Sequence, residues 1–292
     1  MYENYVLLFI AWGIAACSVN DRKIAVQFIS SPVDSISTEP YLFTDANETV
    51  FLSWIEKRNT TSFFKYARLE GDTWSQPVTI DSGSNWFVNW ADYPVMATDG
   101  KQFIANILQK SSDKTYSYDV KLLSSMDGSI WNHVGLLHHD SVQAEHGFVS
   151  LVPFRDGVFA AWLDGRNTGG GHNHESHNGA MTIRAATLGF DGKKVEEWEL
   201  DNRVCDCCQT TAAITDNGPV VIYRDRSDED IRDMSIVRFV NGIWTEPKPI
   251  YSDHWKIDGC PVNGPRGEAL GNMLAVIWFS SAKDQPEVKV IF

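Results

Sequence analysis

The residues best suited to bind a metal are three histidines in the glycine-rich stretch GGGHNHESHNG. His172, His174 and His177 stand at positions i, i+2 and i+5, with Glu175 between them. Imidazoles on so flexible a backbone can wrap around Zn²⁺ or Cu²⁺. Such a tract can equally be a hydrated insertion with incidental metal affinity. Both interpretations stay open, and the sequence requires no cofactor beyond the Zn or Cu that this loop could hold.

Cysteines are the second group that could do chemistry. Cys205, Cys207 and Cys208 cluster in RVCDCCQT, and Cys260 lies further along the chain. An even number of cysteines in an oxidising compartment favours disulfides, and four cysteines allow three pairings. A bridge between the neighbours Cys207 and Cys208 would be strained, so we expect at least one bond from the cluster to Cys260. The alternative is a thiolate site for Cu(I) or Zn, which would use the same sulfurs.

The beginning of the chain predicts the compartment. Val6–Ala16 is an apolar run too short to span a bilayer comfortably, but long enough for the core of a signal peptide. The sequence Ile14-Ala15-Ala16-Cys17 resembles the lipobox of bacterial lipoproteins, which implies cleavage before Cys17 and lipidation of its sulfur. A plain secretory signal or a buried helix is the alternative. We therefore expect a lipid-anchored protein of the bacterial cell envelope that touches the membrane only through its anchor.

Composition excludes several classes of protein. The chain has 292 residues, 43% of them hydrophobic, which is too apolar for a disordered protein. Its formal net charge of −13 argues against nonspecific binding of nucleic acid, which needs a basic surface. The 11 tryptophans favour an all-β protein or a surface that faces carbohydrate.

Five similar segments recur along the chain and must position any site. Each has a short strand, a turn with Asp, Asn or Gly, and an apolar strand, and these second strands centre on Trp54, Ile107, Trp162, Tyr223 and Trp278, at spacings of 53 to 61 residues. Further β runs give about four strands per repeat, which is typical of a β-propeller blade. The fifth repeat stops after roughly three strands, and Ile24–Ile29 could supply its outer strand. We expect a five-bladed ring or a truncated six-bladed ring.

The N-terminal signal and the five repeats together give the expected division of the chain. Residues 1–16 form the lipoprotein signal peptide, residues 17–23 a short anchor linker, and residues 24–292 a single all-β propeller domain.

Several strings resemble a known family. Ser124–Trp131, SSMDGSIW, resembles the Asp-box of sialidase and BNR-repeat propellers, although it is one residue short. In that box the Asp closes the turn on backbone N–H groups while the Trp packs between blades. The strings WFVNWADYP, EHGFVSLVP, WLDGR, RVCDCCQT, YRDRSDEDIRD and GCPVNGP together resemble a group of bacterial sialidase-like lipoproteins, over nearly all of the mature chain. That group generally has a longer chain and six blades.

The resemblance implies a site at the mouth of the central channel. Sialidase chemistry uses arginines to fork a sugar carboxylate, a Tyr activated by a Glu as nucleophile, and an Asp as acid and base. The candidate catalytic residues are Asp92, Glu145 and the phenols Tyr116, Tyr118 and Tyr223. The candidate substrate-binding residues are Arg166, Arg184, Arg224, Arg226, Arg232, Glu39 and Asn263. Glu39 is a departure, because sialidases carry an arginine in the matching segment and a glutamate would repel a carboxylate.

Two functions are compatible with these residues. The first is recognition, and hydrolysis in the manner of an exo-α-sialidase, of an acidic extracellular glycan or another acidic small ligand. The second is a noncatalytic envelope propeller that binds Cu, Zn or a protein partner, because charge-alternating runs such as YRDRSDEDIRD are mostly solvated ion pairs. Geometry distinguishes them: a hydrolase of this type requires Arg166, Arg224 and Arg232 to converge beside a Tyr–Glu pair and an Asp.

Overall fold

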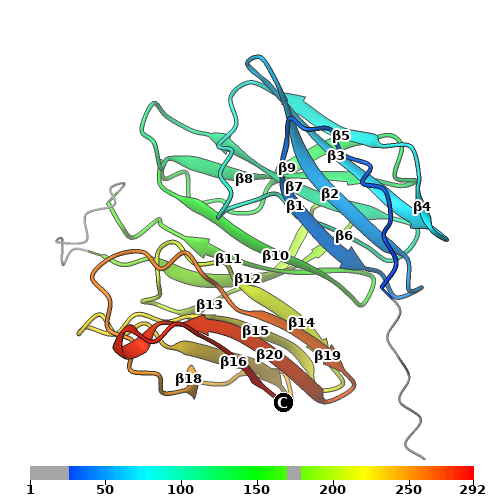
Figure 1. The fold of residues 1–292 in the computed structure, drawn as a ribbon. Coiled ribbons are helices and arrows are strands. Elements are labelled where there is room, and N and C mark those ends of the chain that lie inside the picture. Colours follow the sequence, from blue (N-terminus) through cyan, green and yellow to red (C-terminus); the bar gives the residue numbers. More distant parts are fainter. Residues whose placement is uncertain (1–25, 170–178) are drawn as a thin grey trace, which may run out of the picture.

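Five antiparallel sheets follow one another along the chain in the computed structural model, which describes residues 26–169 and 179–292 (Figure 1). The first sheet contains β1 (Ser37–Thr44), β2 (Val50–Arg58), β3 (Thr61–Glu70), β4 (Thr73–Trp74) and β5 (Val78–Gly83), with β4 and β5 both paired to β3. The second contains β6 (Met96–Thr98), β7 (Phe103–Lys110), β8 (Tyr118–Ser125) and β9 (Asn132–Leu136). The third contains β10 (His146–Phe154), β11 (Gly157–Asp164), β12 (Thr182–Gly189) and β13 (Lys194–Asp201).

The last two sheets complete the set. The fourth contains β14 (Thr211–Thr215), β15 (Gly218–Arg224), β16 (Met234–Val240), β17 (Ile243–Trp244) and β18 (Lys248–Tyr251), with β17 and β18 both paired to β16. The fifth contains β19 (Arg266–Leu270), β20 (Met273–Ser280) and β21 (Glu287–Ile291), with the 3-10 turn η1 (Ala282–Asp284) between its last two strands. No helix in the described part of the chain is long and apolar enough to cross a membrane.

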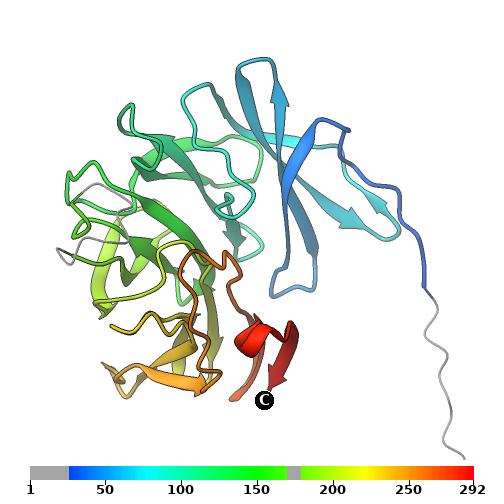
Figure 2. The ribbon, with the colours of Figure 1, turned by 60° about the vertical axis from the view of Figure 1, so that its left-hand side comes forward.

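The five sheets are arranged around one centre (Figure 2). Residues of the first strand of every sheet line one central cavity of about 630 Å³. The beginnings of these strands meet at one end of it. Tyr41 packs against Tyr93, whose hydroxyl donates a hydrogen bond to Gln209, and the Arg266 guanidinium lies over the Tyr93 ring. Of the two rings expected, the five-bladed β-propeller is therefore confirmed. Tyr93, Gln209 and Arg266 lie just before or at the start of the first strand of their blades, and Tyr41 lies within β1.

The cores lie between the blades, which explains why the second strands are apolar on both faces. One buried cluster joins the first and second sheets, and others join the second to the third, the third to the fourth and the fourth to the fifth. Every residue of β11, on the second strand of the third blade, is buried. A strand sandwiched between two neighbouring blades needs this continuous apolar sequence.

The Asp-box-like turn has the geometry expected of such a turn. Asp127 Oδ1 accepts hydrogen bonds from the backbone N–H groups of Ser129 and Ile130, at 2.8 and 3.1 Å. The Trp131 ring packs edge-on against Tyr66 of the first blade and Phe103 of the second. The turn thus packs the second blade against the first.

The expected outer strand of the fifth blade is not formed by the N-terminal segment. Residues 26–30 have no strand structure, and no ladder joins them to the fifth sheet. Val26 and Phe28 are 78% and 96% exposed. In Figure 2 this blue segment runs past the first blade, apart from the red strands of the fifth. The prediction for the described part of Ile24–Ile29 is therefore wrong, because the segment lies on the wrong side of the first blade.

Candidate functional site

A buried tyrosine joins two carboxyl groups at the end of the channel where the first strands begin. Tyr118 Oη lies 2.7 Å from Glu145 Oε1 and 2.8 Å from Asp92 Oδ2. The other oxygen of Asp92 accepts the backbone N–H of Phe148 at 2.7 Å. Tyr118, Asp92 and Glu145 are 0%, 1% and 6% exposed, and Asp92 lines the central cavity. These residues come from two blades but form one constellation.

The backbone explains how the three side chains meet. Tyr118 begins β8, and its N–H donates to the carbonyl of Ala144, next to Glu145. The β10–β11 ladder has an irregularity between Gly147 and Ser150, where Phe148 adopts a φ of 54°. A bulge of this kind re-aims the side chains and N–H groups beside it, and such strained residues gather at functional sites. Here it turns the Phe148 N–H onto Asp92.

A third carboxyl group lies nearby on the first blade. Glu39 has a φ of 58° at an irregularity of the β1–β2 ladder, and it is buried. Burial raises its pKa to about 7, against the opposing charge of Lys57. The charge of Glu39 in turn contributes to the raised pKa of Asp92. The predicted role of Glu39 is substrate binding, whereas the structure places it with the carboxyl groups.

Protonation decides what this constellation can do. Burial raises the pKa of Asp92 well above its ordinary value, and the charges of Glu145 and Glu39 add to the effect. A tyrosine hydroxyl has one proton and cannot donate fully to two carboxylates at once. Both short contacts are satisfied when a protonated Asp92 donates to Tyr118 and Tyr118 donates to Glu145. The site then holds one neutral acid beside one carboxylate, which is the arrangement that acid–base catalysis uses.

Tyr118 itself is poorly placed to be a nucleophile. Burial and the two neighbouring carboxyl groups raise its pKa well above the ordinary value for tyrosine. A phenolate between two carboxylates would be strongly disfavoured. A Tyr–Glu–Asp set is thus present, but its tyrosine connects the two carboxyl groups, and its raised pKa disfavours the phenolate that a nucleophile would need.

Substituting Gly147 with Ala is expected to displace Asp92. A Cβ atom at this position would lie 1.9 Å from Asp92 Oδ2 and 3.0 Å from the Tyr118 ring. The carboxyl group would have to leave Tyr118, so any activity that needs the pair should fall by about 100-fold or more. Turnover by the variant measures the loss. Gly71→Ala is a control in a turn with open space around it, although its φ of 61° also carries some strain. Equal activity in the Gly147 variant and the parent would contradict this role of Asp92.

The same end of the channel also carries a cation. Arg266 Nη2 donates to Gln209 Oε1 at 2.7 Å, and Gln209 Nε2 donates to the carbonyl of Ala91 at 2.8 Å. Both Gln209 and Arg266 line the cavity. Neither is among the residues predicted from the sequence, although both stand just before or at the start of a first strand, as Asp92 does in its own repeat. Alignment of the five repeats on this position would have identified them.

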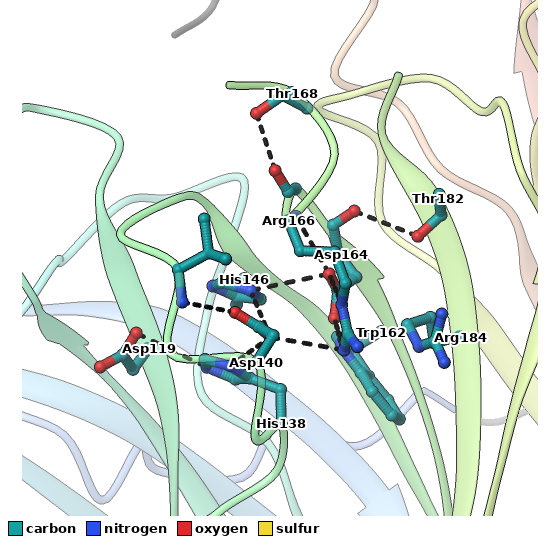
Figure 3. A network of polar contacts seen from close by, with 12 residues as sticks. Asp119, His138, Asp140, His146, Trp162, Asp164, Arg166, Thr168, Thr182 and Arg184 are labelled. Carbon is teal, nitrogen blue, oxygen red and sulfur yellow. Dashed lines mark hydrogen bonds and ion pairs between the residues drawn. The ribbon is translucent and has the colours of Figure 1, made fainter. Parts of the chain in front are cut away.

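A second polar network lies at the exit of β11 (Figure 3). The rings of His138 and His146 stack with centroids 3.6 Å apart. Asp140 Oδ2 lies 3.0 Å from His138 Nδ1 and 3.2 Å from His146 Nε2. Arg166 forks Asp164 through Nε and Nη2, at 2.7 and 2.6 Å. The network fixes the loop after β11 to the loop that precedes β10.

The geometry of this network is unfavourable for a shared metal ion. The two imidazole planes are within 5° of parallel, and the lone pairs of each ring lie in its plane. One ion cannot lie in two parallel planes at once. On the other side, the Arg166 guanidinium already neutralises Asp164 and lies 3.4 Å from Asp140. The acidic groups therefore have an internal cation as their partner.

The buried His138 should make stability depend on pH. Burial, with the charge of His146, lowers its pKa from 6.5 to about 4. Between these values the unfolded chain binds the proton more readily, so stability present above pH 6.5 is lost as the pH falls toward 4. We expect about 2 kcal/mol less stability at pH 5 than at pH 7.5 from this group, measured by urea unfolding. His138→Gln should remove that difference, whereas replacing the exposed His139 by Gln should not.

The arginines predicted to bind a sugar carboxylate do not come together. Arg166 belongs to the His138 network, whereas Arg224 donates to the carbonyls of Asn263, Phe279 and Arg232. Arg232 donates to Cys205 Sγ at 3.3 Å, and both Arg224 and Arg232 are 1% exposed. The prediction that these three guanidiniums converge is therefore wrong. Each already binds other groups of the protein: Arg224 binds backbone carbonyls, Arg232 binds a sulfur, and Arg166 binds carboxylates.

The remaining candidates have partners of their own. Arg184 pairs with Glu197 and Glu199, and Arg226 pairs with Asp206 and Asp230. Tyr223 is buried in the fourth blade, and burial raises its pKa. It donates to Asp201 at 2.7 Å, and this carboxyl group adds to the effect. Tyr116 is 47% exposed and contacts Phe87 edge-on. Asn263 contributes its backbone carbonyl to Arg224. The structure therefore gives the two arginines, Tyr223 and Asn263 structural contacts away from the carboxyl pair.

The cysteines form one disulfide and one close thiol pair. Cys207 is bonded to Cys260, so the expected bond from the cluster to Cys260 is present. Cys205 and Cys208 are buried free thiols. The other predicted sites, the metal loop of His172, His174 and His177 and the lipidation site Cys17, lie outside the described residues.

Comparisons with known proteins identify the fold but no family. No family model and no curated protein matches the chain. Among solved structures, an α-L-arabinofuranosidase variant of Fusarium graminearum bound to an iminosugar inhibitor has a TM-score of 0.56 at 12% identity, over 87% of this chain and 80% of that one. The complex of that arabinofuranosidase with arabinobiose has a TM-score of 0.53 at 12% identity, over 87% and 80%. An α-L-arabinanase of Penicillium chrysogenum bound to arabinobiose has a TM-score of 0.51 at 12% identity, over 87% and 75%. The chain thus shares the five-bladed propeller fold of these glycoside hydrolases.

Proposed function

We propose that this protein binds and hydrolyses a glycan at the channel end where Asp92, Tyr118 and Glu145 meet. One observation carries the proposal: two buried carboxyl groups from different blades share one tyrosine hydroxyl beside a cavity of about 630 Å³. Burying carboxyl groups together is costly unless they are paired or protonated. Such a pair with divided protonation is a common device of glycoside hydrolysis. The likeness in fold to an α-L-arabinofuranosidase and an α-L-arabinanase supports the same class of chemistry.

The two carboxyl groups can divide the work of bond cleavage. Asp92 donates its proton to the glycosidic oxygen, and the Glu145 carboxylate stabilises the positive charge that develops on the anomeric carbon. Water then supplies a hydroxyl group to that carbon and returns a proton to Asp92. The two contacts to Tyr118 Oη keep these oxygens within about 5.5 Å of each other, which is less than the separation that inverting enzymes need to hold a water molecule. We therefore expect hydrolysis with net retention of configuration.

The substrate that fits best carries a negative charge. Arg266 is the one cation among the cavity-lining residues that the structure describes, and its guanidinium lies over the ring of Tyr93, the residue that follows Asp92. A guanidinium can fork a carboxylate, whereas the Glu145 carboxylate would repel it. An acidic sugar would thus point its carboxylate toward Arg266 and its glycosidic bond toward Asp92. Sialic acid and uronic acids both carry such a carboxylate.

The test is a panel of sialylated, uronate-containing and neutral glycans, with sugar release followed by chromatography. We expect release from an acidic glycan, and we expect Arg266→Gln to raise KM at least tenfold for it. Lys101→Gln, a change of charge on an exposed turn, is the control. Release only from neutral glycans, arabinan included, would exclude the acidic substrate. No release from any glycan, with binding of an acidic glycan retained, would favour the noncatalytic alternative.

We also propose that the protein is exported and anchored by a lipid on Cys17. The apolar run Val6–Ala16 and the tetrad Ile14-Ala15-Ala16-Cys17 support this proposal. In bacterial cells fed a radiolabelled fatty acid, the chain should take up label and fractionate with membranes. Cys17→Ala should abolish both. A labelled Cys17→Ala chain, or an unlabelled parent, would contradict lipidation at this residue.

A further inference from the structure

Four sulfur atoms form a continuous group in the segments that precede the fourth and fifth blades. Cys205 and Cys208 are buried, and their Sγ atoms are 3.0 Å apart. Cys205 Sγ also lies 4.0 Å from Cys207 Sγ, which is bonded to Cys260. A free thiol pair with CxxC spacing thus lies in contact with an existing disulfide. This is the arrangement that thiol–disulfide exchange requires.

The charge around Cys205 favours a nucleophilic sulfur. Arg232 is buried and donates from Nη1 to Cys205 Sγ at 3.3 Å. Burial opposes ionisation, but the hydrogen bond from Cys208 and the charge of Arg232 lower the pKa of Cys205 to about 7. Burial and the neighbouring Cys205 raise the pKa of Cys208, which therefore keeps its proton. The same guanidinium would repel Zn²⁺ or Cu⁺, so the surroundings favour exchange over metal binding.

We propose that Cys205 and Cys208 exchange with the Cys207–Cys260 disulfide, giving the protein two disulfide isomers. The Cys205 thiolate attacks Cys207 Sγ, forming a Cys205–Cys207 bond and releasing Cys260 as a thiolate. Cys208 then loses its proton to Cys260 and attacks Cys205, which releases Cys207 as a thiolate that takes up the proton first lost by Cys205. One disulfide breaks and one forms, so the rearrangement needs no oxidant or reductant.

The exchange would act on the channel mouth through the chain itself. Cys208 directly precedes Gln209, which holds Arg266 and the carbonyl of Ala91. Gly264, four residues after Cys260, packs so closely on the carbonyl of Gln209 that a Cβ there would lie 2.0 Å from the oxygen. Releasing Cys260 removes the covalent tie between this segment and the CDCC turn. The two isomers therefore differ in what holds Gln209 in place.

Alkylation of the folded protein tests the exchange. The parent carries Cys17→Ser so that only the four relevant cysteines are counted. It is incubated with N-ethylmaleimide at neutral pH without reductant, and its adducts and disulfides are mapped by mass spectrometry over time. Cys260 is exposed whereas Cys205 and Cys208 are buried, so a released Cys260 should be captured first. We expect a Cys260 adduct to accumulate together with a Cys205–Cys208 disulfide.

Two variants separate the steps. Cys205→Ser removes the attacking sulfur and should lower the rate of Cys260 labelling at least tenfold. Cys208→Ser removes the resolving sulfur and should leave a Cys205–Cys207 bond in the labelled protein. If a variant does not fold, the adducts and disulfides found in the parent protein still test the proposal. Labelling of Cys205 and Cys208 with Cys260 still bonded to Cys207 would overturn the proposal. Stoichiometric bound copper or zinc would overturn it as well, in favour of a metal site.

Discussion

Asp92→Asn and Glu145→Gln are each expected to lower kcat for glycan hydrolysis by about 100- to 10,000-fold, with a much smaller change in KM. The amide of the first variant would lack the acidic proton, and the amide of the second would lack the charge that stabilises the anomeric carbon. Both replacements keep the size of the side chain, so the cavity should stay intact. Initial rates on the glycan identified by the substrate panel, with thermal unfolding to confirm the fold, give the measurement.

Two control variants distinguish the two carboxyl groups that react from the tyrosine hydroxyl that joins them. Tyr118→Phe keeps the ring but removes the hydroxyl that joins the two carboxyl groups. It should cost less activity than either carboxyl variant and change the pH profile, because the protonation of Asp92 would no longer be coupled to Glu145. Asp191→Asn, on an exposed hairpin, should leave kcat unchanged. Full activity in Asp92→Asn or Glu145→Gln would refute the assignment.

The repeat pattern made most of the fold predictable. A second strand with both faces buried needs a continuous apolar sequence, so Trp54 and Trp162 mark their blades even in a single sequence. Trp278 is also buried and marks the fifth blade, although only one face of β20 is buried. Ring closure was not predictable in the same way. Any short apolar segment can supply an outer strand on composition alone, and only the path of the chain puts residues 26–30 beside the first blade.

The candidate site was predictable in part. Asp92 and Glu145 stand just before first strands, whose beginnings converge in a propeller, so their proximity follows from the fold. The choice of tyrosine does not, because Tyr118 comes from another strand 26 residues after Asp92. Arg224 and Arg232 were misassigned for a physical reason. Buried carbonyls and thiols attract guanidinium groups as a sugar carboxylate does, and a charged sequence does not distinguish these partners.

Arg224→Ala is expected to destabilise the folded protein strongly, by about 3–5 kcal/mol. The guanidinium donates to three backbone carbonyls, of Arg232, Asn263 and Phe279, and its Cζ lies 4.8 Å from the centre of the Trp255 ring. Alanine would leave these buried acceptors without a donor and open a cavity beside Trp255. Because Asn263 and Phe279 belong to the fifth repeat, the loss should loosen the fifth blade from the fourth. Urea unfolding at neutral pH measures the change.

Two matched variants show whether the forked geometry or merely the charge matters. Arg224→Lys keeps the charge, but a single ammonium cannot reach three carbonyls in a planar fork, so it should recover less than half of the loss. Arg184→Ala removes an arginine whose partner Glu199 is 41% exposed, and it should cost about 1 kcal/mol or less. If Arg224→Ala were no more destabilising than Arg184→Ala, Arg224 would not be a structural residue. Arg224 would then again be a candidate for binding the substrate, and it would compete with Arg266 for the sugar carboxylate.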